Sequence, residues 1–273
     1  MTQPWIKEEG VSYLLAVDID GTLVKHDGSL SPAVAQAARQ VIEAGHHLVI
    51  STGRSTGATL PILQEIGLTQ GHAVCANGAV TLSISPAHPG GYRVIDRVSF
   101  DPSQALTLLK DRFPQASIAL ETPDGTVYST PGFEDWSFGV QSTKASAEEL
   151  ADMTQAVRLV LSSEKDTSAD FRQAVKEVGL HGVNYAVGWS AWLDISAHGV
   201  TKASALEQLR RKLGVDPRHT ISAGDGLNDL DMLAWAARGV AMGQALPEVK
   251  AKAREVTGSV DEDGLLAVFK SLI

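Results

Sequence analysis

The chain has 273 residues and a formal net charge of -9, with 44% hydrophobic and 20% charged residues. This length suits one large domain or two modest ones, and the composition is that of a globular protein with a buried core. The excess of acidic residues argues against a nucleic-acid partner, because a protein that reads a phosphate backbone needs a basic surface. A small anion can still bind, since a cation or a local lysine reverses the field within one site.

The N-terminal segment and the cysteine content favour a cytoplasmic protein. After the polar segment MTQPWIKEEG, the apolar run YLLAV is too short for the hydrophobic region of a signal peptide. No stretch approaches a membrane span of about 20 apolar residues. The single cysteine, Cys75, rules out an internal disulfide framework and fits a reducing compartment. We therefore expect no membrane partner, and the sequence leaves the oligomeric state open.

The N-terminal part predicts strands that alternate with helices. Residues 13–17 form a buried strand, and HHLVIST forms a second one. Between them, Ser31-Pro32 marks the start of a helix, with serine at the N-cap and proline at the first helical position, and Gly45 marks its end. A strand, helix and strand in this order, with continuously apolar strands, predict a parallel sheet covered by helices.

The middle of the chain has a different pattern. Its turn TPDGTV is typical of antiparallel pairing. The strands predicted for this region are 79–84, 92–98, 116–121, 126–129, 157–162 and 183–188, and the helices are 103–113, 145–153 and 169–178. We expect its tryptophans, Trp136, Trp189 and Trp192, to pack in a core rather than to form a platform for a sugar ring.

The alternation returns towards the C-terminus. The predicted elements there are a helix at 202–213, a strand at 219–225, a helix at 229–236, a strand at 239–243 and two terminal helical segments. We therefore predict an α/β fold with a Rossmann-like parallel-sheet core, residues 1–81 and 195–273, and an inserted α+β cap, residues 82–194.

Four polar clusters lie next to the predicted core elements. Because ligands of an open parallel sheet bind at the carboxyl ends of its strands, we expect these clusters to converge on one crevice. They are DIDGT after the first strand, STGR after the second, GVTK before a helix and GDGLND after a later strand.

Convergence would gather four carboxylates, which could not stay ionised together without a cation. They belong to Asp18, Asp20, Asp225 and Asp229. Hard oxygen ligands in this number suit Mg²⁺, which favours phosphate-bearing substrates. Phosphate oxygens could be held by Thr52, Lys202 and the amides of the glycine-rich turns.

An aspartate of this cluster could attack phosphorus, as carboxylates do in aspartyl-phosphate enzymes. Two unit charges about 4 Å apart repel by roughly 4 kcal/mol at an effective dielectric constant of about 20, and a phosphate dianion roughly doubles this energy. Unscreened repulsion of that size would slow the reaction by about six powers of ten. The attack therefore needs both Mg²⁺ and Lys202.

The four motifs together resemble the haloacid dehalogenase superfamily of phosphotransferases, and most closely its Cof-type sugar-phosphatase branch. The resemblance implies that Asp18 is the nucleophile and Asp20 the general acid and base. It also implies that the backbone carbonyl of Asp20 contributes to the metal site. The branch inserts a large α+β cap after the TGR element, and ANGA at 76–79 resembles its usual approach to the cap.

The resemblance also implies the remaining site residues. The phosphate-binding residues are Thr52, Gly53, Arg54, Lys202 and Asn228, and the metal-binding residues are Asp18, Asp20, Asp225 and Asp229.

The predicted function is that of a Mg²⁺-dependent phosphatase. Its substrate would be a small phosphorylated metabolite, a sugar phosphate, hydrolysed through an aspartyl-phosphate intermediate. Two alternatives stay open: a phosphomutase on the same core, and a non-catalytic protein that binds a phosphorylated metabolite. Dependence on a bisphosphate activator would reveal the mutase, and turnover with Mg²⁺ would exclude the binding protein. The sequence does not identify the physiological substrate.

Overall fold

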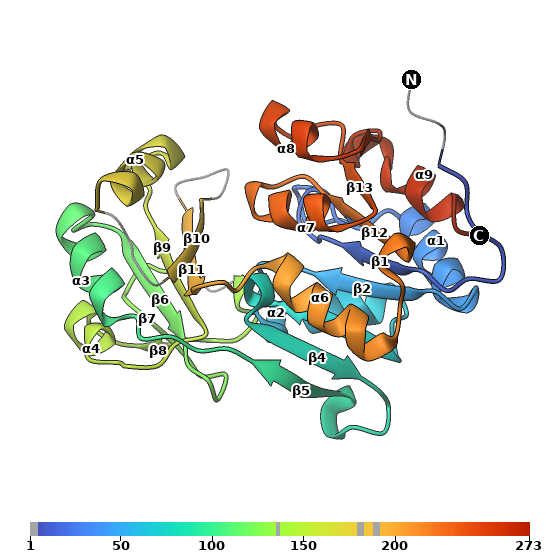
Figure 1. Cartoon of the computed structure of the whole chain (residues 1–273). Coiled ribbons are helices and arrows are strands. Elements are labelled where there is room, and N and C mark those ends of the chain that lie inside the picture. Colours follow the sequence, from blue (N-terminus) through green and yellow to red (C-terminus); the bar gives the residue numbers. More distant parts are fainter. Residues whose placement is uncertain (1–4, 135–136, 179–182, 188–191) are drawn as a thin grey trace.

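The computed structural model describes residues 5–134, 137–178, 183–187 and 192–273. These residues form an eight-stranded sheet and a six-stranded sheet, which lie side by side with helices packed on them (Figure 1). No helix among them is long and apolar enough to cross a membrane.

The larger sheet has the strand order β14-β13-β12-β1-β2-β3-β4-β5. Its six strands from β14 to β3 are parallel, and β4 and β5 extend the sheet in antiparallel pairing. The strands are β1 (Leu14–Val17), β2 (His47–Ser51), β3 (Gly71–Cys75), β4 (Val80–Ile84), β5 (Tyr92–Arg97), β12 (Thr220–Gly224), β13 (Arg238–Ala241) and β14 (Glu255–Val256).

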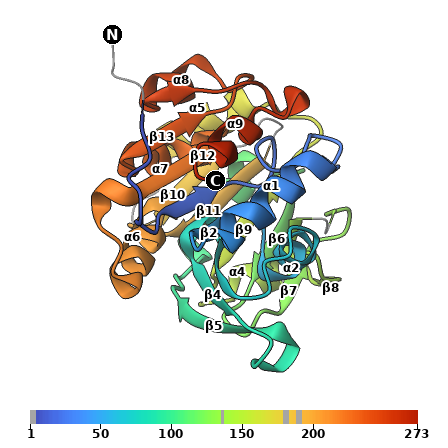
Figure 2. The same ribbon diagram turned by 90° about the vertical axis from the view of Figure 1, so that its right-hand side faces the viewer.

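Helices cover both faces of this sheet, as the apolar strands predict (Figure 2). Along β1, Leu14 and Ala16 pack in the cluster that contains Leu206 of α6. Leu15 and Val17 point the other way, into the cluster that contains the apolar residues of α1, α2 and α9. The parallel α/β core predicted from the sequence is thereby confirmed. The helices of this part are α1 (Pro32–Glu43), α2 (Thr56–Glu65), α6 (Lys202–Leu213), α7 (Leu230–Trp235), α8 (Pro247–Lys252) and α9 (Leu265–Lys270).

The smaller sheet has the strand order β10-β11-β9-β6-β7-β8. One of its faces packs against α3, α4 and α5 in a separate apolar cluster, and the other face is turned towards the larger sheet (Figure 1). Its strands are β6 (Ser117–Glu121), β7 (Val127–Ser129), β8 (Thr143–Lys144), β9 (Arg158–Ser162), β10 (Val183–Val187) and β11 (Trp192–Ala197). Its helices are α3 (Ser103–Arg112), α4 (Ala147–Ala151) and α5 (Ser168–Val178).

The chain passes from the larger sheet to the smaller one, and back again, at residues that differ from the predicted domain boundaries. The boundary at 81/82 falls within β4, which pairs with β3 and belongs to the larger sheet with β5. The boundary at 194/195 falls within β11, which belongs to the smaller sheet. The sequence predicts that the cap begins within β4 and includes β5, because strand patterns alone do not tell which sheet an antiparallel strand joins.

Candidate active site

The carboxyl ends of β1 and β12 bring two aspartates together. Asp18 follows β1, and its backbone N–H donates to the carbonyl of Ala223 in β12 at 3.1 Å. Asp225 follows β12. Gly21 has a φ of +79°, and a Cβ added there would lie only 2.4 Å from Oδ2 of Asp225. The glycine in DIDGT is therefore what lets this loop lie against Asp225.

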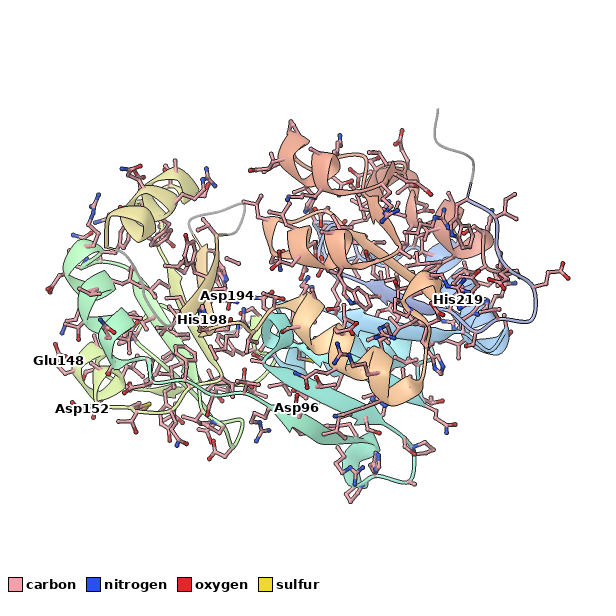
Figure 3. The ribbon with its side chains drawn as sticks, viewed as in Figure 1. Asp96, Glu148, Asp152, Asp194, His198 and His219 are labelled. Atoms are coloured by element: carbon pink, nitrogen blue, oxygen red, sulfur yellow. The ribbon has the colours of Figure 1, made fainter. Side chains whose placement is uncertain are left out.

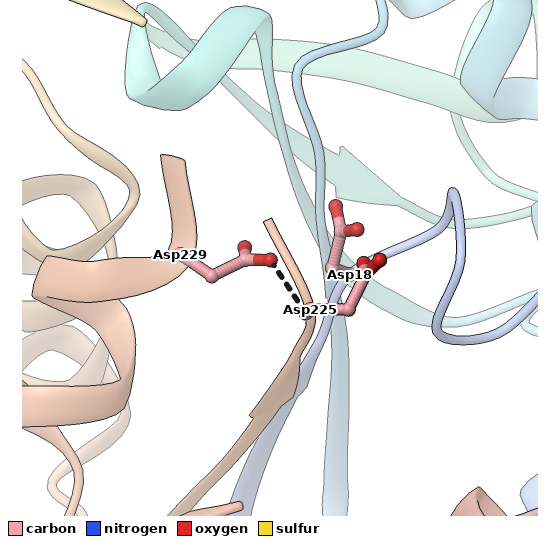
Figure 4. Close-up of side chains that lie close together, drawn as sticks. All are labelled: Asp18, Asp225 and Asp229. Carbon is pink, nitrogen blue, oxygen red and sulfur yellow. Dashed lines mark hydrogen bonds between the residues drawn. The ribbon is translucent and has the colours of Figure 1, made fainter. Parts of the chain in front are cut away.

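Three carboxylates form a buried cluster at this point (Figure 4). One oxygen from each of Asp18, Asp225 and Asp229 lies within 4.8 Å of the others. Asp229 ends the 3-10 turn Leu227–Asp229, and its Oδ2 accepts the backbone N–H groups of Asp225 at 3.0 Å and Gly226 at 2.9 Å. The GDGLND turn thus holds the third carboxylate in place with its own backbone.

Lys202 supplies the cation of the cluster. It is the first residue of α6, whose start is fixed by a capping box between Thr201 and Ser204. Its fully buried Nζ donates to Oδ1 of Asp18 at 2.6 Å and to Oδ1 of Asp229 at 2.7 Å. With three ionised carboxylates and one ammonium group, the cluster carries two uncompensated negative charges.

The protonation equilibria reflect this imbalance. Burial and then the charge of Asp229 raise the pKa of Asp18 well above its ordinary value. Burial and Asp229 also raise the pKa of Asp225 to about 7. Burial alone would lower the pKa of Lys202, but the charges of Asp18 and Asp229 outweigh it and raise this pKa. Without a cation, part of the cluster therefore takes up protons near neutral pH.

The donor set fits a divalent cation such as Mg²⁺. Its members are carboxylate oxygens in a buried pocket, and their excess charge matches that of the ion. Two residues that the sequence analysis missed support Asp225: Thr22 donates to its Oδ1 at 3.2 Å, and Gln244 lies 3.4 Å from its Oδ2. Gln244 also donates to the carbonyl of Gly21 at 2.6 Å.

The Asp20 side chain lies outside this cluster. Its carboxylate forms a two-pronged ion pair with Arg54, with Nε to Oδ2 at 2.9 Å and Nη2 to Oδ1 at 2.6 Å. The Asp20 side chain is 49% exposed, which gives it access to the cavity that it lines. In this structure Arg54 of the STGR segment therefore contacts Asp20.

The STGR turn is joined to the other motifs by Asn77, which the sequence analysis did not single out. The Asn77 backbone N–H donates to the carbonyl of Thr52 at 3.0 Å, and its Oδ1 accepts from Nδ2 of Asn228 at 3.0 Å. A Cβ on Gly53 would lie 3.2 Å from the same Oδ1. Asn77 has a φ of +51°, a conformation that asparagine adopts more readily than most residues. Its place in ANGA is the sequence signal that could have identified it.

A cavity of about 300 Å³ opens above the cluster, between the two sheets. Its wall on the larger sheet includes Asp18, Asp20, Gly53, Arg54, Asn77, Asp225, Gly226, Leu227, Asn228 and Leu246. Its wall on the smaller sheet includes Ser137, Arg158, Ser168, Arg172, Ala186, Val187, Trp192 and Asp194. Trp192 packs against an apolar cluster of the smaller sheet, as expected, but it also lines the cavity. Trp136 and Trp189 lie outside the described residues.

A buried polar network joins the two walls. Arg158 of β9 pairs with both carboxylate oxygens of Asp194 in β11 at 2.8 Å each (Figure 3 labels Asp194). Arg158 also donates to Oγ of Ser55, the residue after the STGR segment, at 3.2 Å. Ser55 in turn donates to the buried carboxyl group of Glu121. The sequence analysis missed these residues, although a charge at the end of an apolar strand, as in SIALE and RLVLS, is a signal for Glu121 and Arg158.

Carboxylates gathered around a lysine at the ends of parallel strands, beneath a cap, are an arrangement that can hold a cation and a phosphoryl group in an α/β enzyme. The chain belongs to the haloacid dehalogenase-like hydrolase family, whose model matches residues 15–269. The sequence similarity to individual relatives extends over nearly the whole chain. YkrA of Bacillus subtilis (strain 168) is 30% identical over 271 residues, which cover 96% of this chain and 98% of YkrA.

Two further comparisons concern named activities. The 5-amino-6-(5-phospho-D-ribitylamino)uracil phosphatase YitU of Bacillus subtilis (strain 168) is 28% identical over 267 residues, covering 94% of this chain and 96% of YitU. The solved structure of a sugar phosphatase of subclass IIB of the family superimposes with a TM-score of 0.80 at 25% identity, covering 96% of this chain and 100% of that one. The inserted α+β cap agrees with that subclass.

Proposed function

We propose that this phosphatase is Mg²⁺-dependent and hydrolyses a small phosphorylated metabolite through an aspartyl-phosphate on Asp18. The observation that carries this proposal is the buried cluster of Asp18, Asp225 and Asp229 around Lys202. Asp18, Asp225 and Asp229, with the backbone carbonyl of Asp20, would hold the ion. When bound, the ion supplies positive charge that offsets the repulsion between the carboxylates and the phosphate.

Asp18 is suited to act as the nucleophile. Lys202 holds its Oδ1, whereas its Oδ2 accepts no hydrogen bond from the part of the chain that the structure describes. Oδ2 would attack phosphorus and form a P–O bond as the bond to the leaving oxygen breaks. In the second step, water would attack the same phosphorus and return the carboxylate of Asp18. Lys202 then offsets the negative charge of the phosphoryl group throughout the reaction.

Asp20 is suited to move the protons. It lies two residues from Asp18 at the mouth of the cavity, and its carboxyl group would protonate the departing alkoxide. It would then take a proton from the attacking water. Arg54, which pairs with it, would orient this carboxyl group and contact the phosphoryl group together with Thr52 and Gly53. Lys202 and Asn228 complete the proposed phosphate site.

The comparisons support two kinds of substrate. A sugar phosphate is supported by the subclass IIB structure, which is described as a sugar phosphatase. The name of YitU instead describes a phosphorylated ribityl chain that carries a uracil ring. Both substrates are small phosphorylated metabolites, and this is the substrate class that we propose.

The test is phosphate release from a panel of phosphorylated metabolites. We expect wild-type protein to release phosphate and the free alcohol with Mg²⁺, and to release none in EDTA. Asp18→Asn should abolish turnover without loss of fold, whereas Asp111→Asn, at an exposed position of α3, should not affect it. Isomerisation that requires a bisphosphate would identify a mutase instead. Tight binding without turnover would identify a binding protein.

A further inference from the structure

The helix α5 of the cap presents two polar side chains to the cavity above the carboxylate cluster. Ser168 and Arg172 both line this cavity, and their spacing of four residues places them on one face of the helix. Phe171 and Ala174 are buried in the apolar cluster of the cap, and they hold the helix in place on its other side. Arg172 also lines a second hollow, of about 590 Å³, which shares several residues with the first. Its side chain therefore lies where the two spaces meet.

Arg172 differs from the other arginines of the cavity wall in having no counter-ion among the described residues. Arg54 is paired with Asp20, and Arg158 is paired with both carboxylate oxygens of Asp194. No hydrogen bond or ion pair joins Arg172 to the part of the chain that the structure describes, and the residue is exposed. Its guanidinium group is therefore available to an anion that enters the cavity.

The phosphoryl group that is transferred has cations of its own on the opposite wall. Lys202, Arg54 and the proposed metal ion belong to the larger sheet, whereas Arg172 belongs to the cap across a cavity of about 300 Å³. This volume suits a small ligand, whose other end then reaches the cap. A carboxylate or a second phosphoryl group at that end can accept two parallel hydrogen bonds from a guanidinium group, whereas a hydroxyl group leaves the charge unmatched.

We propose that Arg172 is a specificity-determining residue, and that with Ser168 it forms a second anion site for the leaving group of the substrate. The substrate would then be a phosphate monoester that carries a further anionic group, either a carboxylate or a second phosphoryl group, at its other end. This inference rests on the proposed phosphatase function and narrows its substrate class. Arg172 supplies the charge, and the hydroxyl group of Ser168 supplies a further hydrogen-bond donor beside it.

The experiment compares kcat/KM with Mg²⁺ within two matched pairs of substrates. The first pair, 3-phosphoglycerate and glycerol 3-phosphate, differs by a carboxylate in place of a hydroxymethyl group. The second pair, fructose 1,6-bisphosphate and fructose 6-phosphate, differs by a second phosphoryl group. Wild-type protein should prefer the doubly anionic member of at least one pair, and the pair in which it does so identifies the second anion. Rising salt should reduce this preference, because Arg172 is exposed.

Substitution of Arg172 measures its share of the preference. Arg172→Leu should lower the ratio of kcat/KM for the preferred doubly anionic substrate to that for its partner by about 10- to 100-fold, mainly through KM. Arg172→Lys should keep part of the ratio, since it retains the charge but loses the planar fork. Arg93→Leu is the matched control, because Arg93 of β5 is also exposed and without a counter-ion among the described residues, but lines neither space.

The outcomes separate this inference from the proposed function. Phosphate release by wild type without preference for the doubly anionic member of either pair would overturn the second anion site, whether or not a variant folds. An unchanged ratio in Arg172→Leu would also overturn it, and would favour pairing of Arg172 with Asp231 or Glu248, the exposed acids that line the second hollow. Equal losses on both members of a pair would contradict it as well. No release from any phosphorylated metabolite would overturn both proposals.

Discussion

Lys202 sets the charge balance on which the site depends. It is fully buried and bridges two carboxylates from different motifs, which is a place that the sequence alone could only suggest. The sequence analysis grouped Asp18, Asp225 and Asp229 with Lys202, and the structure brings all four together. It did not foresee that Arg54 pairs with Asp20, because the direction of a long side chain on a turn is set by neighbours that are distant in sequence.

Asp225 gives the metal-free protein a pH-dependent stability. Its pKa of about 7 in the folded chain exceeds the ordinary value of about 3.9 that is expected after unfolding. Between these values only the folded state binds this proton, so the group destabilises the fold increasingly as the pH rises. In EDTA we expect the unfolding free energy to fall between about pH 5.5 and about pH 8, with on the order of a few kcal/mol due to Asp225.

Urea unfolding of wild-type and Asp225→Asn proteins at both pH values measures this contribution. The variant should lose less stability than wild type as the pH rises, because within the cluster only the raised pKa of Asp18 then contributes, and Mg²⁺ should stabilise wild type more at the higher pH. Equal pH dependence in the two proteins would show that Asp225 does not hold a proton near neutrality.

Asp20 provides a test that depends on the leaving group. An alkoxide is a poor leaving group and needs a proton, whereas p-nitrophenolate leaves readily without one. We expect Asp20→Asn to lower kcat/KM for an alkyl phosphate by on the order of 10²–10⁴ and to affect p-nitrophenyl phosphate much less. Arg54→Met, which removes the ion pair but keeps the carboxyl group, should lower both by a similar factor. Equal losses in Asp20→Asn would mean that the proton comes from another group.

At the scale of elements, the strand ends and helix starts carry the site. The sequence predicts β1, α1, β2, α6 and β12 well, because their apolar runs and caps are distinct. It did not predict α2 or β3. The strand β3 (Gly71–Cys75) has only three buried residues, and α2 (Thr56–Glu65) contains Pro61. Both lack the pattern that identifies such elements without tertiary context.

The placement of α6 depends on a close backbone contact. Gly78, at the end of the 3-10 turn Ala76–Gly78, has a φ of +105°, and a Cβ there would lie 2.2 Å from the carbonyl oxygen of Thr201. We expect Gly78→Ala to displace the start of α6 and with it Lys202, which should reduce kcat and cost about 1–3 kcal/mol of stability from backbone strain, with the steric clash in addition.

The other end of the same helix supplies the control. Gly214 has a φ of +68°, but no atom lies within 4 Å of the position of an added Cβ. Gly214→Ala should therefore lose stability through backbone strain, but its kcat should not fall. Thermal unfolding and steady-state kinetics compare the two variants, and full activity in folded Gly78→Ala would contradict the proposed role of this contact.

At the scale of the whole molecule, the two sheets are joined by buried polar groups as well as by the chain. The backbone N–H of Ser55 donates to the carbonyl of Ser137 at 3.0 Å, and Arg158 reaches both residues. A Cβ on Gly139 would lie 2.2 Å from the backbone nitrogen of Ala58, so the cap loop and α2 are in direct backbone contact. Such contacts between sheets could not be predicted from the sequence, since they depend on how two domains dock.

Arg158 is the residue whose loss should affect this junction most. Arg158→Leu would leave the buried Asp194 without its cation and remove a positive charge that acts on the buried Glu121, and we expect it to lower the unfolding free energy by about 3–5 kcal/mol. Arg218→Leu, which removes an exposed ion pair with Asp216, should have no resolvable effect. Chemical denaturation of both variants measures the difference. Equal stability of the two would show that the network does not hold the sheets together.

The central claim, that Asp18 becomes phosphorylated, is tested most directly by rapid acid quenching during turnover. Wild-type protein with Mg²⁺ and a phosphorylated substrate is quenched within the first turnover, digested and mapped by mass spectrometry. We expect a phosphoryl group on the peptide that contains Asp18, located on Asp18 itself, and none in EDTA or in Asp18→Asn. Phosphate release without any phosphorylated protein, or with the phosphoryl group on another residue, would contradict the account.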